Sequence, residues 1–229
     1  MLAKHKNKVN FREFILGGQD GLVNVLGLVL GVASATFDTN IVLISGIVAT
    51  VAESVSMAAV AYTSSKAAKD YCESIIEEEK IEVSNKPRLE ESKIREIYYK
   101  KGFRGKALNE IVKNITSNKK LWAETLLLEE HKIISGEFEN PLRSAWVVGF
   151  STIIGSLIPL MPFFFFNVKV SMITSLILAG VVLFVVGALK AKLSIGSWKR
   201  SGLELMIIGI IAALVGYGVG FLLNGYGLS

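Results

Sequence analysis

The stretch AESVSMAAVAYTSSKAAKDYCESIIEEEKIE, residues 52–82, changes from apolar to highly charged, and no Pro or Gly interrupts it. Its first half carries one acid, Glu53, and one thioether, Met57, among small apolar residues, whereas four of its last six residues are Glu. This pattern predicts a single helix that begins in an apolar environment and ends in water. The question is why one helix would connect an apolar environment to a dense set of carboxylates.

Apolar runs long enough to cross a bilayer lie on both sides of this change. Hydrophobic residues make up 51% of the 229 residues, and the mean hydropathy is +0.48, which is high for a soluble domain. A crossing needs about 20 apolar residues, and five runs reach that length: 14–37, 41–64, 145–166, 168–189 and 203–223. The sequence therefore predicts an all-α integral membrane protein with five transmembrane helices. Residues 1–13 are charged and no cleavable signal pattern follows them, so we expect the first run to stay in the mature protein.

Lysine and arginine are distributed unevenly between the connecting segments. Four lie before the first run, sixteen between the second and third runs, and four in residues 190–200. The 38–40 loop and the C-terminal tail have none, and the 163–169 loop has one. Because positive residues gather on the cytosolic side, we expect the N-terminus and the central segment in the cytosol and the C-terminus outside. For a prokaryotic chain, the expected location is the cell membrane.

The central segment is predicted to be a helical domain. Residues 65–140 hold fifteen of the twenty Asp and Glu residues and an equal number of Lys and Arg. Turn and capping residues divide it into a continuation of the long helix to about 84 and helices at 88–101, 105–117 and 119–135. The predicted domains are 1–64 with two spans, a cytosolic helical metal-binding domain at 65–143, and 144–229 with three spans.

Two acids lie within the predicted membrane spans. Asp20 and Asn24 share a face of the first span with Gly27, Gly31 and Ser34, and Glu53 and Met57 share a face of the second with Gly46 and Thr50. Acids in a span usually face a bundle interior or a water-filled path, and a thioether suits a borderline cation such as Fe²⁺. We predict a transport pathway of Asp20, Asn24, Glu53 and Met57. In the alternative reading the small residues serve only helix packing, Met57 fills space, and Asp20 is interfacial.

Carboxylates of the central segment lie beside its apolar helix faces. Glu79 and Glu82 are one turn apart at the end of the long helix, Glu90 shares a face with Ile94 and Ile97, and Glu129 and Glu130 lie next to apolar faces of the fourth helix. Such charges commonly form only a solvated surface. Buried carboxylates need partners or a metal, however, so carboxylates converging from three helices predict a site for a hard or borderline divalent cation.

Other classes of function have less support in the sequence. Cys72 is the only cysteine and His5 and His131 the only histidines, so no disulfide and no multi-histidine site forms within one chain. No basic stripe suits nucleic acid. Di-iron enzymes use a Glu-x-x-His pair on each of two helices, and only Glu129-Glu130-His131 comes near, so we do not expect an enzyme. A membrane-anchored metal buffer or sensor stays open as the alternative, although spans that only anchor need no buried acids.

Three features together resemble a known family. GGQDGLVNVLGLVLGVA (17–33), SMAAVAY (56–62) and a Glu-rich helical insert before three further spans are similar to the vacuolar iron transporter family over nearly the whole chain. The resemblance implies a five-span homodimer in membrane lipid that exports Fe²⁺, and often Mn²⁺, from the cytosol in exchange for protons. It also implies a path at the dimer interface and no permanently bound cofactor.

The resemblance assigns roles to single residues. Asp20 and Met57 match the family's membrane ligands, and its metal-binding glutamates correspond to Glu79, Glu82, Glu90 and Glu130. The chain departs from the family pattern at three places. Lys93 replaces a glutamate, and Leu126 and Leu127 replace a methionine pair. Ala61 replaces a further glutamate, and Glu53 is placed to compensate for that loss. We therefore expect a cytosolic site with fewer ligands and no thioether, with Glu129 and His131 as extra partners and with a harder metal preference or a weaker affinity.

Overall fold

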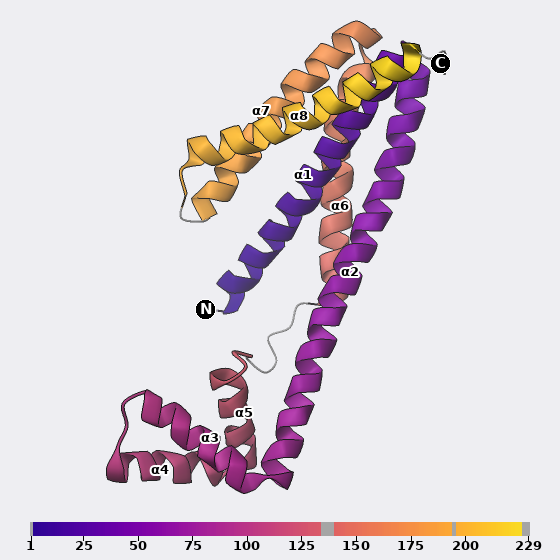
Figure 1. Ribbon diagram of the computed structural model, residues 1–229. Helices are drawn as coiled ribbons and strands as arrows, with labels where there is room; N and C mark the ends of the chain where they lie inside the picture. The colour runs from indigo at the N-terminus through magenta and orange to yellow at the C-terminus, as the bar shows by residue number, and fades with distance from the viewer. Residues whose placement is uncertain (1, 134–139, 194–195, 226–229) are drawn as a thin grey trace. The chain divides into compact units, whose positions relative to one another are not determined.

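The computed structural model describes residues 2–133, 140–193 and 196–225 (Figure 1). All regular structure in these ranges is helical: α1 (Leu2–Thr36), α2 (Thr39–Asn85), α3 (Pro87–Lys100), α4 (Gly105–Thr116), α5 (Lys119–Glu129), α6 (Pro141–Leu160), the 3₁₀ helix η1 (Met161–Phe164), α7 (Val168–Leu193) and α8 (Trp198–Gly225). Five stretches are long and apolar enough to cross a membrane, in α1, in α2, in α6 with η1, in α7 and in α8. The predicted all-α class with five spans is confirmed.

The chain divides into two compact units. The first comprises residues 1–63 and 141–229, and the second comprises residues 64–140. Helix α2 is continuous and contributes to both, as the absence of Pro and Gly in residues 52–82 predicts. Asp38 begins it, because its Oδ1 accepts hydrogen bonds from the backbone N–H of Asn40 (2.7 Å) and Ile41 (3.4 Å).

In the first unit α1 packs closely against both α6 and α8 (Figure 1). Glycines at the crossings allow the backbones to touch, since a Cβ on Gly155 would lie 1.9 Å from the carbonyl oxygen of Gly18. On the α8 side, a Cβ on Gly220 would lie 1.9 Å from the carbonyl oxygen of Gly31. The hydroxyl of Ser34 donates to the carbonyl oxygen of Tyr217 (3.0 Å). The small residues in the second half of α1 therefore serve helix packing, as the alternative reading of this stripe expects.

Two serines of α7 donate hydrogen bonds to the end of α6 and to η1. Ser175 Oγ donates to the carbonyl oxygen of Pro159 in α6 (2.6 Å), and Ser171 Oγ donates to that of Pro162 in η1 (3.0 Å). The Pro162 oxygen also accepts from the backbone N–H of Phe165 and Phe166. These bonds join the end of α6 and η1 to α7.

The second unit consists of the end of α2 with α3, α4 and α5. Its core is a single apolar cluster of Val83, Ile94, Leu108, Val112, Ile115, Trp122, Ala123 and Leu126. Asn118 caps α5, because its Oδ1 accepts from the backbone N–H of Lys120 (3.0 Å) and Leu121 (3.3 Å). The prediction of a helix to residue 135 is wrong, since α5 ends at Glu129 and Lys132 has a positive φ of 59° that no α-helix continues through. Ile134, which the sequence placed on this helix, lies outside the described residues.

The contact between Gly155 and Gly18 yields a stability prediction. Gly155→Ala is expected to lower the free energy of unfolding by about 1–3 kcal/mol, the usual range for overpacking, because its methyl group would meet rigid backbone at 1.9 Å. Thermal unfolding of the purified protein in detergent measures the change. Gly218→Ala is the matched control, since a Cβ there has nothing within 4 Å. Equal melting temperatures for the two variants would contradict the assigned packing.

Candidate functional site

The second unit contains a cluster of carboxylates around the side chain of Lys93. The Nζ atom of Lys93 lies 3.0 Å from Oε2 of Glu90, 3.5 Å from Oε2 of Glu130 and 3.8 Å from Oε2 of Glu82. Glu82 comes from α2, Glu90 and Lys93 come from α3, and Glu130 directly follows α5. Three separate segments therefore place their acids around one ammonium group.

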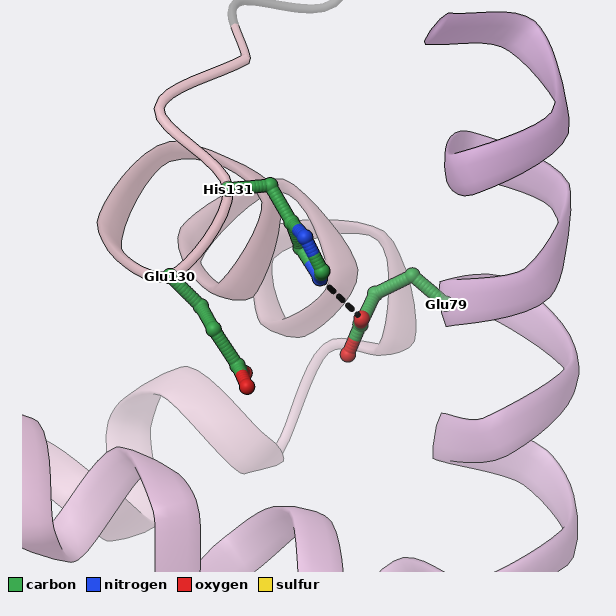
Figure 2. A group of neighbouring side chains, drawn as sticks. All are labelled: Glu79, Glu130 and His131. Atoms are coloured by element: carbon green, nitrogen blue, oxygen red, sulfur yellow. Dashed lines mark hydrogen bonds and ion pairs between the residues drawn. The ribbon is translucent and has the colours of Figure 1, made fainter. Parts of the chain in front are cut away.

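Glu79 and His131 extend this cluster. Together with Glu130 they form the part of it in which a metal ion would fit. Figure 2 shows the side chain of Glu79, from α2, directed toward Glu130 and His131, which follow α5. One ligand atom from each of the three residues lies within 4.8 Å of the others, and His131 Nε2 is 3.2 Å from Glu79 Oε2. Two carboxylate oxygens and an imidazole nitrogen at this spacing can bind one divalent ion.

Two of the carboxylates are buried and incompletely paired. Glu79 is 3% exposed and Glu90 is 0% exposed. The Oε1 atom of each has no hydrogen-bond partner among the described residues. A buried polar group without a partner is unfavourable, and a buried charge more so. The cluster therefore carries negative charge that its own side chains do not balance, which favours a bound cation.

The surroundings of Lys93 keep its ammonium group charged. Burial by itself would lower the pKa of Lys93, but the hydrogen bond with Glu90 and the negative charges of Glu130, Glu90 and Glu79 raise it above its ordinary value. Because the ordinary value is already about 10.4, the group is a permanent cation at neutral pH. This residue stands where the resemblance expected a further glutamate, so a cation occupies the place of a ligand.

The structure places the remaining predicted residues of this region in different positions. Glu79, Glu82, Glu90 and Glu130 come together, and His131 joins them. Glu129 forms an ion pair with Lys101 instead. Leu126 and Leu127 are 0% and 1% exposed, so they are buried and supply no ligand.

In the first unit, α1 and α2 bring three of the predicted pathway residues together. Asn24 Nδ2 donates a hydrogen bond to Glu53 Oε1. The side chain of Asp20 lies close to that of Glu53. Asn24 is exposed, whereas Asp20, Glu53 and Met57 are partly exposed, so this group lies at the surface of the unit. Exposed apolar residues of α2 flank it, including Val48, Val51 and Val55.

Comparison with known proteins gives the family. The sequence pattern of the VIT family matches residues 11–221 of this chain. The chain belongs to the VIT family. The resemblance seen in the sequence is thereby confirmed, and with five apolar helices this VIT-family protein is a multi-pass integral membrane protein.

Relatives of this VIT-family protein include proteins from plants and yeast. Vacuolar iron transporter 1 of Tulipa gesneriana is 28% identical over 207 residues, which cover 90% of this chain and 84% of the relative. Vacuolar iron transporter 1 of Oryza sativa subsp. japonica is 26% identical over 209 residues, covering 91% and 83%. Protein CCC1 of Saccharomyces cerevisiae is 26% identical over 210 residues, covering 88% and 65%.

Sequence reasoning named His131 as an extra partner of the site in this VIT-family protein, but it did not identify two specific pairings. The ion pair of Lys93 with Glu90 had a local signal, because residues three apart on a helix are neighbours. The contact between His131 and Glu79 spans 52 positions, and no spacing rule reports it. A histidine just after an apolar helix face was the only indication.

The different surroundings of two adjacent acids yield a binding prediction. Glu130→Gln is expected to weaken Mn²⁺ binding by at least tenfold, since even the loss of a residue that only orients a ligand typically costs about 10–100-fold. Glu129→Gln is the control, because Glu129 already pairs with Lys101 outside the cluster. Isothermal titration calorimetry of the detergent-solubilised protein measures both affinities. An equal loss in the two variants would contradict the assignment of Glu130.

Proposed function

We propose that this VIT-family protein transports a divalent metal ion, Fe²⁺ or Mn²⁺, out of the cytosol in exchange for protons. The two plant relatives named above are iron transporters by name, which supports metal as the cargo. The observation that carries the proposal is the pair of buried carboxylates, Glu79 and Glu90. Each has an oxygen without a hydrogen-bond partner among the described residues, and Glu79 contacts His131. A transient cation would balance charge that the protein leaves unbalanced.

The cluster in the second unit would collect the ion. Carboxylate oxygens with one imidazole suit Fe²⁺ and Mn²⁺. Buried leucines replace the thioether pair that the resemblance implied. The ligands are therefore harder than in a site with methionines, and Mn²⁺ would suit the site as well as Fe²⁺. The Lys and Arg distribution supports a cytosolic position for this unit, which would make it the entry side of the transporter.

The acid pair in the first unit would serve the membrane part of the path. Asp20 and Glu53 can hold one proton between them or give it up for a cation, which is the minimum that an exchanger needs. Asn24 and Met57 would add an oxygen and a sulfur ligand. Because the group lies at the surface of its unit, among apolar residues, a second copy of the chain would enclose it, and we place the path at that homodimer interface.

Metal flux into proteoliposomes tests the membrane path. The double variant Asp20→Ala with Glu53→Ala is expected to lose proton-coupled Mn²⁺ and Fe²⁺ transport, because no acid would remain in the path to exchange a proton. Glu204→Ala, which removes an exposed acid of α8, should leave flux unchanged. Undiminished proton-coupled flux in the double variant would rule out this path. Metal binding by the unaltered protein without any flux would instead identify a membrane-anchored buffer.

A further inference from the structure

Lys93 differs from the other paired lysines of the second unit. Lys69, Lys80 and Lys100 each pair with one acid a single turn away on the same helix, and both partners are well exposed. Such surface pairs contribute little. Lys93 contacts acids from three segments, one of them the fully buried Glu90. Its ammonium group therefore offsets negative charge from three acids of the cluster at once.

The ammonium group and a metal ion would share one carboxylate. Glu130 belongs both to the group around Lys93 and to the group with Glu79 and His131 that could hold an ion. Two cations at contact distance from one carboxylate repel each other. A divalent ion held by Glu79, Glu130 and His131 therefore favours withdrawal of Lys93.

The side chain of Lys93 can also reach solvent. Its side chain is 28% exposed, although its partner Glu90 is 0% exposed. A lysine side chain can turn its charged end into water and leave its methylene groups against the protein. Release of the ammonium group would cost the fold little, provided that another cation takes over the charge of Glu90.

We propose that Lys93 is an internal competing cation, which neutralises the carboxylate cluster when it is empty and is displaced into solvent when a divalent ion binds. This inference rests on the proposed metal-collecting role of the cluster. The tethered ammonium group lowers the affinity for the ion and stabilises the ion-free form. Its return would assist release of the ion toward the membrane path.

Affinity measurements on two lysine variants test the competition. Lys93→Gln should bind Mn²⁺ about tenfold more tightly than the unaltered full-length protein, within the 5–150-fold range usual for coupled ligands. Lys100→Gln is the matched control, because Lys100 pairs with Glu96 outside the cluster and both side chains are well exposed. Calorimetry in detergent should show almost no change for it. Unchanged or weaker binding by Lys93→Gln, or equal tightening in both variants, would overturn the proposal.

Amine labelling of the unaltered protein gives a readout that does not depend on a variant folding. Acetic anhydride followed by mass spectrometry reports how accessible each lysine is. Saturating Mn²⁺ should increase acetylation of Lys93, whereas Lys100, which pairs with Glu96 away from the cluster, should not respond. Constant or decreased labelling of Lys93 would overturn the proposal.

The metal-collecting role of the cluster and the competing role of Lys93 can be disproved separately. If Mn²⁺ does not bind at this cluster, so that Glu130→Gln leaves the affinity unchanged, the collecting role and the role of Lys93 are both wrong. If binding depends on Glu130 but neither lysine experiment responds, only the role of Lys93 is wrong.

Discussion

The carboxylate of Glu90 is completely enclosed by the second unit, and a charge in that position must be balanced for the unit to be stable. Lys93 supplies one positive charge at 3.0 Å, but Glu79, Glu82 and Glu130 add further negative charge around it. The apolar core of α3, α4 and α5 holds these acids close together despite their repulsion. A second cation is the simplest way to complete the balance, so the arrangement of this unit favours binding of a metal ion.

The same constraint applies where the chain crosses the membrane. Asp20 and Glu53 lie in mostly apolar stretches of α1 and α2, and Asn24 donates a hydrogen bond to Glu53. Lipid provides no hydrophobic force between helices, so close packing at glycine-lined crossings sets the position of α1. That packing occupies the faces of α1 toward α6 and α8, and Asp20 and Asn24 remain beside α2. The close helix contacts of α1 and its polar contact with α2 therefore involve different neighbouring helices.

The five spans could be predicted from the length of the apolar runs, and the continuity of α2 from the absence of Pro and Gly between residues 52 and 82. The end of α5 could not be predicted in this way. Lys132 has a positive φ, and no glycine or proline at that position signals it in the sequence. Periodicity also could not separate Glu129 from Glu130, which are adjacent in the sequence at the end of α5. Lys101, 28 positions earlier, pairs with the first and leaves the second to the cluster, and only tertiary structure contains that information.

The central claim is that acids in both units serve one travelling ion. Anomalous scattering from crystals of the full chain soaked in Mn²⁺ tests it most directly. The account predicts one peak among Glu79, Glu90, Glu130 and His131 and a second beside Asp20 and Glu53. Ions bound only at other positions, with Asp20 and Glu53 turned toward lipid, would contradict it.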